Sequence, residues 1–358
     1  MAFELGIYHF GEITEDPHTG RTPTHKQRLR DLVEQARVAD QVGLDLFAVG
    51  EHHRTDFVVS APTVVLAAMA ERTENITLSS AVTVLSSEDP VRVFQQFATL
   101  DLLSDGRVEI IAGRGSYTES FPLFGYDLSQ YHDLFAEKLD LLLKLREENP
   151  ITWSGRLRPA LDNADVTPRP ERRIPVWVAV GGTPASVVRA AHRGLPLALA
   201  IIGGGYARFS QFTDLYREQA AAAGHDPASL PVSINSPGFL APTSQEALEI
   251  SYPYFNAGML QNFHQRGRGF HTPYKAYQAQ SSLAGAYVNG SPQQVIDKIL
   301  AQHEVFANQR LVIQMGFGNV PQKEMLRSIE LLGTEVAPVV KKEIAAREKA
   351  PGAKEQKR

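Results

Sequence analysis

Short apolar segments alternate with longer segments of helical periodicity along most of the 358-residue chain, and this alternation constrains the fold most strongly. The expected strands are rich in Val, Ile, Leu and Ala and are often apolar throughout, as buried parallel strands are. They span residues 3–10, 44–49, 76–85, 107–112, 174–180, 196–202, 232–240 and 311–315. Strands separated by helices in this way predict an α/β fold, a parallel (β/α)8 TIM barrel with its active site at the carboxyl ends of the strands.

Capping residues mark helix boundaries in the expected barrel. A helix is expected over about residues 23–42 with Gly43 as its C-cap, and Asp89 followed by Pro90 marks the start of another. Further helices are expected to begin near Thr183, Ala207 and Ser291.

Two connections are too long for a minimal barrel and predict insertions after the fourth and seventh strands. Residues 149–173 contain several prolines, and residues 251–289 include a stretch rich in Gly, His, Arg and aromatic side chains. Connections of this length are often functional, so the second is either a lid or an ordered surface excursion. We assign residues 1–340 to the barrel domain and expect the charged residues 341–358 to form a flexible C-terminal tail.

The composition excludes several classes of function. The formal net charge is −4 and no basic stripe occurs, so nucleic acid is not an expected partner. The chain has no cysteine, which excludes disulfides, iron–sulfur clusters, zinc-thiolate sites and a thiol nucleophile. No segment approaches the ~18 apolar residues of a membrane span and no basic leader precedes the first strand, so we expect a cytoplasmic protein without membrane contact.

The second expected strand ends in Glu51, His52 and His53. Side chains alternate along a strand, so Glu51 and His53 share one direction and His52 takes the other. One of these directions faces the pocket at the barrel rim, where a histidine can exchange protons near neutral pH. The alternative is a structural histidine bonded to a neighbouring carbonyl. A metal site is disfavoured, because no second histidine cluster completes a ligand set.

A glycine-flanked arginine follows the fourth expected strand. Arg114 stands between Gly113 and Gly115, so the backbone can approach a ligand closely while the guanidinium reaches an anion. The alternative is an ordinary tight turn between strand and helix.

A second glycine-containing turn follows the fifth expected strand. Gly181 and Gly182 precede a helix with Thr183 at its start and Ser186 in its first turn. Exposed N–H groups, the positive helix end and two hydroxyls favour a phosphate cradle over simple N-capping by Thr183.

Three segments together resemble the luciferase-like flavin monooxygenase family, and the resemblance covers nearly the whole chain. The most specific segment lies within residues 76–125 and reads AVTVLSSEDPVRVFQQFATLDLLSDGRVEIIAGRGSYTESFPLFG. The others are QMGFGNVPQKEMLRSIELLGTEVAPVV at residues 314–340 and GSPQQVIDKI at residues 290–299. They are similar to the family's strand–helix–strand core, its last strand and helix, and the start of its penultimate helix.

The resemblance implies a role for each matching residue. His52 matches the family's catalytic histidine. Positions that contact the flavin match Ala81, Val82, Arg114, Ser116, Tyr117, Gly182, Thr183 and Ser186. Among them, Arg114, Thr183 and Ser186 match ligands of the flavin phosphate, with a backbone contact at Gly182. The bond between Ala81 and Val82 matches a non-prolyl cis peptide under the flavin ring.

The resemblance implies a monooxygenase that uses reduced FMN and O2 to insert one oxygen atom into a small organic substrate through a C4a-(hydro)peroxyflavin. No Gly-x-Gly-x-x-Gly fingerprint of a nicotinamide domain is complete, so a separate flavin reductase is expected to supply the reduced FMN. Gly113 and Ile201 stand where luciferase has a reactive cysteine and a tryptophan, which predicts a non-luminescent member. The alternatives are hydride transfer with the deazaflavin F420 and a flavin-binding protein without turnover.

The sequence also predicts a homodimer. Residues 62–71 form an expected helix that is apolar nearly all round, and the next helix carries Val91, Val93, Phe94 and Phe97. One barrel face cannot bury all of these side chains, so the two helices are expected to form the dimer contact. The alternative is tight packing of small alanines against the barrel.

Overall fold

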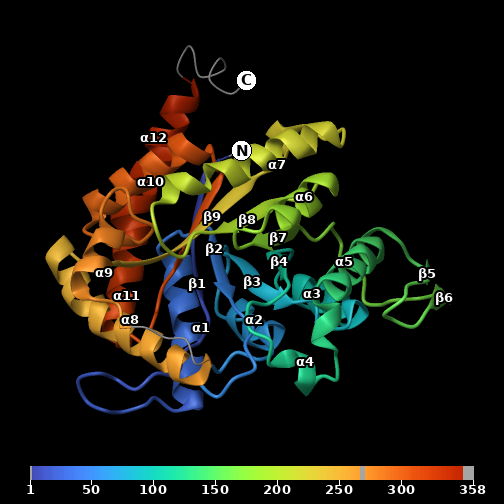
Figure 1. Ribbon diagram of the computed structural model, residues 1–358, viewed down its shortest axis with the longest axis horizontal. Coiled ribbons are helices and arrows are strands. Elements are labelled where there is room, and N and C mark those ends of the chain that lie inside the picture. Colours follow the sequence, from blue (N-terminus) through green and yellow to red (C-terminus); the bar gives the residue numbers. More distant parts are fainter. Residues whose placement is uncertain (1, 267–270, 350–358) are drawn as a thin grey trace.

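Eight parallel strands form a closed barrel in the part of the chain that the structure describes. A computed structural model describes residues 2–266 and 271–349. The barrel strands are β1 (Glu4–His9), β2 (Leu46–Val49), β3 (Thr77–Val84), β4 (Val108–Gly113), β7 (Val176–Val180), β8 (Leu197–Ala200), β9 (Val232–Leu240) and β11 (Arg310–Gln314). Neighbours pair in this order, and β9 pairs with both β8 and β11, which closes the ring. Each strand falls on an expected segment, so the predicted TIM barrel is confirmed (Figure 1).

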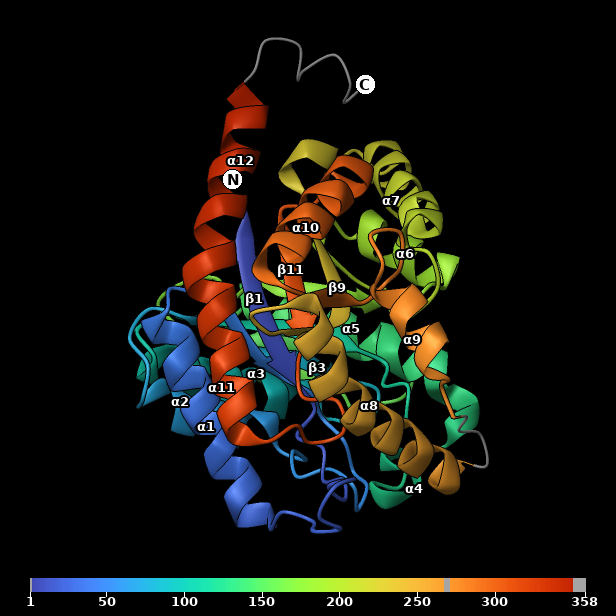
Figure 2. The same ribbon diagram turned by 90° about the vertical axis from the view of Figure 1, so that its left-hand side faces the viewer.

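Helices cover the outside of the barrel (Figure 2). Capping side chains start several of them. The outer helices are α1 (His25–Gln41), α2 (Pro62–Ala70), α3 (Pro90–Leu103), α5 (Tyr131–Glu147), α6 (Pro184–His192), α7 (Ser210–Ala222), α10 (Pro292–Phe306), α11 (Gln322–Leu331) and α12 (Ala337–Lys349). Asp89 accepts hydrogen bonds from the Val91 and Arg92 N–H groups at the start of α3. This confirms the expected N-cap at Asp89.

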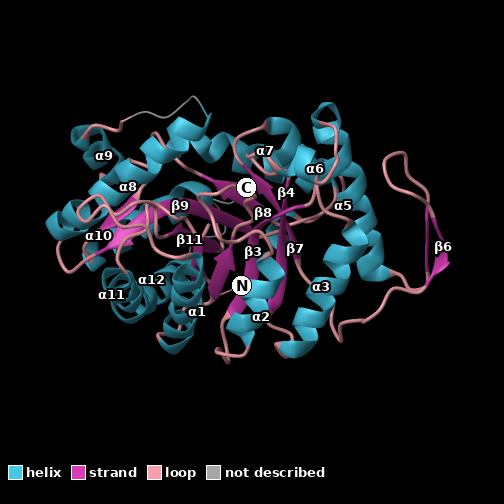
Figure 3. Ribbon diagram, turned by 90° about the horizontal axis from the view of Figure 1, so that it is seen from below, coloured by secondary structure: helices cyan, strands magenta, loops and turns pink. Residues whose placement is uncertain are grey.

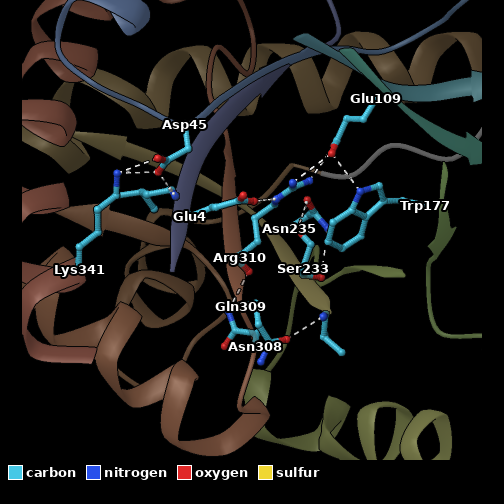
Figure 4. Close-up of polar contacts among 12 residues, drawn as sticks. Glu4, Asp45, Glu109, Trp177, Ser233, Asn235, Asn308, Gln309, Arg310 and Lys341 are labelled. Atoms are coloured by element: carbon cyan, nitrogen blue, oxygen red, sulfur yellow. Dashed lines mark hydrogen bonds and ion pairs between the residues drawn. The ribbon is translucent and has the colours of Figure 1, made fainter. Parts of the chain in front are cut away.

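A buried ion-pair network fills the amino end of the barrel. Arg310 on β11 donates to both carboxylate oxygens of Glu109 on β4, at 2.7 and 3.0 Å, and to Glu4 on β1 at 2.6 Å (Figure 4). The Trp177 indole N–H on β7 donates to the same Glu109 carboxylate at 3.0 Å. The buried polar groups at the amino end thus form hydrogen bonds with one another. The cavity lies at the opposite, carboxyl end of the barrel.

The first long connection, residues 149–173, contains an antiparallel hairpin. β5 (Ile151–Trp153) pairs with β6 (Leu161–Ala164), and the hairpin projects from the side of the barrel beyond α5 (Figures 1 and 3). The Glu137 carboxylate on α5 accepts three backbone N–H groups from residues 156–158, at 2.8, 2.9 and 3.1 Å. The expected insertion after the fourth strand is therefore present and is anchored on α5.

The second long connection, residues 251–289, is mostly helical, which corrects the expectation of a long loop. It is occupied by α8 (Ser244–Arg266) and α9 (Tyr274–Ser281), and the short strand β10 (Val288–Gly290) then pairs with β9. Residues 267–270 of the expected lid lie outside the described residues. The sequence shows no helical pattern here because α8 has no continuous apolar stripe and contains Pro253.

Close backbone packing holds α8 over the carboxyl end of the barrel. A Cβ atom on Gly258 of α8 would lie 3.1 Å from the backbone of Gly318, in the loop after β11. Gly318 has a φ of +70°, and a Cβ atom there would overlap the Tyr254 carbonyl of α8. The two glycines therefore let α8 approach the loop closely enough to form a roof.

The ordered chain extends beyond the expected barrel boundary at residue 340. The last helix, α12, continues to Lys349, with Val340 and Ile344 buried and Lys341 Nζ donating to Asp45 at 2.8 Å. Residues 341–349 therefore form part of the helical shell, which differs from the expected tail. Val340 and Ile344 are four residues apart and pack on one side of the helix despite its charged composition. Residues 350–358 lie outside the described residues.

Most of the apolar residues from which a dimer contact was predicted are buried within the single chain. Val93, Phe94 and Phe97 on α3 are buried, which corrects the expectation that one barrel face cannot bury them. Val64 on α2 is 68% exposed, and Leu103 at the end of α3 is 56% exposed. Assembly through α2 and the end of α3 stays a prediction.

Candidate active site

A cavity of about 550 Å³ opens at the carboxyl end of the barrel, under the roof formed by α8. Its inner wall includes the small side chains of Ala81, Ala179, Ala198 and Ala200, and small inward-facing residues leave space in a barrel of this size. Figure 3 shows the loops and helices that gather at this end of the barrel. The volume falls in the range of ~300–1,000 Å³ that is typical of small-molecule sites.

Most of the expected site residues meet in this cavity. Those that line it are His52, Ala81, Val82, Arg114, Ser116, Tyr117 and Thr183. Gly182 and Ser186 are not among the lining residues but flank Thr183 in the turn and the first helical turn of α6. Residues that the sequence analysis assigned to one site therefore lie around one cavity in the fold.

The Glu51 carboxylate ties the end of β2 to the end of β3. It accepts the Val84 backbone N–H at 2.8 Å, and His53 Nε2 lies 2.8 Å from its other oxygen. The predicted shared direction of Glu51 and His53 is confirmed. However, both of these residues line the cavity together with His52, so the expectation that only one direction faces the pocket is wrong.

His52 lies in a box of aromatic rings at the cavity wall. Its ring centroid is 4.2 Å from that of Phe57, 4.7 Å from that of Tyr117 and 4.8 Å from that of Phe10. Its backbone N–H donates to the Val59 carbonyl at 2.9 Å. The aromatic rings fix the imidazole orientation and limit its contact with water.

The carboxyl ends of β3 and β4 meet in close contact. The peptide bond between Ala81 and Val82 is cis, as the resemblance implied. A Cβ atom on Gly113 would lie 2.6 Å from the Val82 side chain. Position 113 therefore has no room for a cysteine unless Val82 moves.

Tyr117 connects the turn after β4 to His52 and Arg54. The Arg54 guanidinium lies 4.7 Å from the Tyr117 ring centroid and donates to both Asp56 oxygens, at 2.9 and 2.7 Å. Ser116 precedes Tyr117 and is exposed at the cavity rim. The cavity wall next to His52 therefore contains aromatic rings and the ion pair between Arg54 and Asp56.

The amino end of α6 presents unsatisfied donors, as a phosphate cradle requires. Thr183 is the N-cap residue, yet its side chain makes no capping hydrogen bond. Ser186 is 3% exposed and its Oγ has no hydrogen-bond partner. Gly182 has a φ of +100°, which favours glycine and turns the chain into the helix. These features fit an anion bound at the helix end.

Arg114 lines the same cavity as Thr183, and a second arginine, Arg189, lies in the last turn of α6. Arg114 Nη1 donates to His132 Nδ1 at 2.7 Å, and its guanidinium lies 5.1 Å from the Tyr131 ring centroid. Arg189 belongs to α6 itself, and burial, followed by the charge of Arg114, lowers its pKa. Sequence reasoning missed Arg189, although its spacing of three residues from Ser186 on a helix could have indicated it.

The opposite wall carries a second residue that the sequence analysis missed. Glu12, in the loop after β1, is buried and lines the cavity, with Arg28 Nη2 3.8 Å from its Oε2. Burial raises the pKa of Glu12 to about 7, although Arg28 opposes the increase. Nearby, the Tyr8 hydroxyl donates to Gln314 Oε1 at 3.2 Å. A lone glutamate in a turn gave no sequence signal for this position.

Within residues 2–266 and 271–349, no three His, Asp or Glu side chains are grouped so that they could hold a metal ion. None of the helices in these ranges combines the length and apolar character that crossing a membrane requires.

Several known proteins resemble this chain. A family model described as luciferase-like monooxygenase matches residues 3–309. The alkanal monooxygenase alpha chain of the Kryptophanaron alfredi symbiont is 26% identical over 345 residues, covering 88% of this chain and 94% of that protein. An F420-dependent glucose-6-phosphate dehydrogenase of Amycolatopsis mediterranei (strain U-32) is 32% identical over 166 residues, covering 43% of this chain and 48% of that protein.

A solved structure shares the fold over nearly its whole length. It is the oxygenating constituent of 3,6-diketocamphane monooxygenase from Pseudomonas putida, a type II Baeyer-Villiger monooxygenase in complex with FMN. Its TM-score is 0.76 at 21% sequence identity, and the match covers 94% of this chain and 99% of that chain.

Proposed function

The chain belongs to the luciferase-like monooxygenase family, and on that premise we propose that it is a monooxygenase dependent on reduced FMN. It inserts one oxygen atom from O2 into a small organic substrate. The observation that carries this proposal is the unsatisfied anion cradle at the start of α6, beside a cavity that holds His52. The names of two relatives, an alkanal monooxygenase and a monooxygenase bound to FMN, support the choice of reaction and cofactor.

The chain's own residues would hold FMN by its phosphate. Arg114, Thr183 and Ser186 are the proposed phosphate ligands, with a backbone N–H contact at Gly182. The proposed contacts to the rest of the flavin come from residues at the ends of β3 and β4, namely Ala81, Val82, Ser116 and Tyr117.

Reduced FMN, when bound, supplies the electrons and the centre at which O2 is activated. His52 donates or accepts a proton at its imidazole nitrogens, close to the space left for the substrate. The Glu51 contact to the Val84 N–H holds the end of β2, and so His52, in place. The α8 roof keeps bulk water from the cavity.

The proposal also includes the protein's partners and location: a separate flavin reductase supplies reduced FMN, and the protein acts as a homodimer in the cytoplasm. Position 113 is a glycine where luciferase has a cysteine, and a Cβ atom there would meet Val82. This supports the assignment of the protein as a non-luminescent member of the family.

Flavin titration combined with oxygen uptake tests the proposal. The protein is titrated with FMN and with F420, and oxygen uptake is then measured with each reduced cofactor. We expect FMN binding and protein-dependent oxygen consumption. F420 binding without oxygen consumption would favour hydride transfer, the activity in the name of one relative. FMN binding with flavin reoxidation unchanged by the protein would favour a flavin-binding protein without turnover.

A further inference from the structure

Two guanidinium groups, those of Arg114 and Arg189, lie against the first turns of α5, where Arg114 contacts Tyr131 and His132 and Arg189 lies over Phe135. In residues 2–266 and 271–349, no ion pair joins either arginine to an acid. Arg114 donates to His132 Nδ1, which is a ring nitrogen and not a carboxylate oxygen. Arg189 Nη1 is buried and has no hydrogen-bond partner, and the guanidinium lies 5.5 Å from the Phe135 ring centroid.

The two positive charges repel each other in this arrangement. Burial lowers the pKa of Arg189 first, and the charges of Arg114 and Arg193 lower it further. Asp140 is the nearby acid, but Arg193 occupies both of its oxygens, at 2.7 and 3.0 Å. Like charges brought together at a half-buried site cost free energy, and an anion between them would remove that cost.

Residues of α6 point to the position of this anion. Ser186 and Arg189 are three residues apart on α6 and therefore neighbour each other on its surface, and Thr183 precedes them as the N-cap residue. Thr183 makes no capping bond, and the buried Ser186 Oγ has no partner. The Ser186 hydroxyl and the Arg189 Nη1 group are therefore left without an acceptor on the helix whose positive end lies at Thr183.

We propose that Arg189 is a second cationic ligand of the flavin phosphate, and that Arg114 and Arg189 together select a dianionic phosphomonoester. The identity of the ligand as a flavin rests on the proposed function. The phosphomonoester of FMN carries roughly −1.5 to −2 charges near pH 7. Riboflavin has no phosphate, and the phosphodiester of F420 carries one charge, so two guanidiniums favour FMN over both.

The test compares Arg189→Gln with Arg193→Gln, which removes the same charge one helical turn away where Asp140 is its partner. Dissociation constants for FMN and riboflavin are measured by quenching of flavin fluorescence at fixed ionic strength. Arg189→Gln is expected to weaken FMN binding about tenfold and to leave riboflavin binding unchanged. Arg193→Gln should bind FMN nearly as the wild type does. Thermal midpoints of both variants confirm that they are folded.

Inorganic phosphate serves as a probe that does not depend on the flavin. Phosphate should raise the thermal midpoint of the wild-type apoprotein, and this shift should shrink in Arg189→Gln but persist in Arg193→Gln. If phosphate stabilises as expected and FMN does not bind, the anion site holds and the proposed function fails. Equal FMN affinity in the wild type and Arg189→Gln, or an equal loss for FMN and riboflavin, would overturn the proposed role of Arg189.

Discussion

Arg114 lies half-buried at the end of β4, with one side of its guanidinium on the Tyr131 ring and Nη1 on His132. Neither partner is a carboxylate, so the charge remains available to a bound anion. Replacing Arg114 with Ala should weaken FMN binding by about 1–3 kcal/mol, because a charge-assisted hydrogen bond to phosphate is lost. Riboflavin should bind the variant as it binds the wild type.

Flavin fluorescence titration measures the Arg114 effect, and Arg156→Ala provides the control. Arg156 lies on the exposed hairpin between β5 and β6 and pairs with Asp133 at 3.1 Å. The control removes one positive charge without touching the cradle, so FMN affinity should not change. A loss of affinity that is equal for FMN and riboflavin would contradict a phosphate contact at Arg114.

Glu12 is a buried carboxyl whose environment opposes ionisation. The fold raises its pKa from 4.5 to about 7, mainly through burial. The native state therefore holds this proton more tightly than the unfolded chain does. The resulting stabilisation is complete below pH 4.5 and is lost as the pH rises through about 7.

Glu12→Gln should therefore flatten the dependence of stability on pH. Each unit of pKa difference corresponds to about 1.4 kcal/mol, so the wild type should lose roughly 1–3 kcal/mol more than the variant between about pH 5 and pH 8. Urea unfolding at both pH values measures the difference. Glu15→Gln, a change at the exposed neighbouring carboxyl, should leave the wild-type profile intact. Parallel profiles for the wild type and Glu12→Gln would refute the raised pKa.

Individual residues differed in how well the sequence could indicate them. His52, Arg114, Thr183 and Ser186 lie in short local motifs at strand ends, and the barrel brings strand ends together. The electrostatic influence of Arg114 on Arg189 depends on how α6 lies relative to α5, where Arg189 is over Phe135 and Arg114 is over Tyr131. Such a contact between distant segments has no local pattern in the sequence.

At the scale of elements, apolar composition was a sufficient signal for the barrel strands. Each of them lies inside an expected segment or within one residue of it, because both faces of a barrel strand are buried. The hairpin of β5 and β6 and the helix α8 were not predicted. The hairpin lies in a proline-rich connection, and α8 contains Pro253 and mixes polar with apolar residues around its circumference.

The roof position of α8 depends on the absence of a side chain at Gly318. Gly318→Ala combines an unfavourable φ of +70° with overlap against the Tyr254 carbonyl. The variant should lose at least about 2 kcal/mol of unfolding free energy. Gly43→Ala is the matched control, because its φ of +76° is similar and no atom lies within 4 Å of the added Cβ. Its loss should stay near 1 kcal/mol. Equal losses in urea unfolding would show that α8 does not pack tightly on Gly318.

For the whole molecule, the exposed apolar side chains of α2 and α3 predict assembly. Val64 and Leu103 remain exposed although neighbouring apolar residues are buried. Light scattering at micromolar concentration should give twice the mass of the chain. Val64→Arg should shift the protein toward monomer, whereas Val339→Arg, at an exposed valine of α12, should not. A monomeric wild type would exclude the dimer.

The barrel combines buried ion pairs at its amino end, a cavity lined by small residues, and a rim with the proposed anion cradle on one side and His52 on another. A monooxygenase needs all three parts at once: a fixed cofactor, a proton-transfer group and a space sheltered from water. The central claim is that these parts cooperate in a reaction between bound reduced FMN and O2.

Stopped-flow absorbance tests this claim most directly. Protein loaded with reduced FMN is mixed with oxygenated buffer, and spectra are compared with those of free reduced FMN, His52→Ala and His53→Ala. We predict a transient spectrum in the wild type that matches neither reduced nor oxidised flavin, because the cavity shelters the reacting centre. His52→Ala should bind FMN normally but form the transient species at least ~10-fold more slowly. His53→Ala, which loses the contact to the Glu51 carboxylate, should mainly lose stability. Reoxidation that follows free FMN in every protein, without a transient spectrum, would contradict the account.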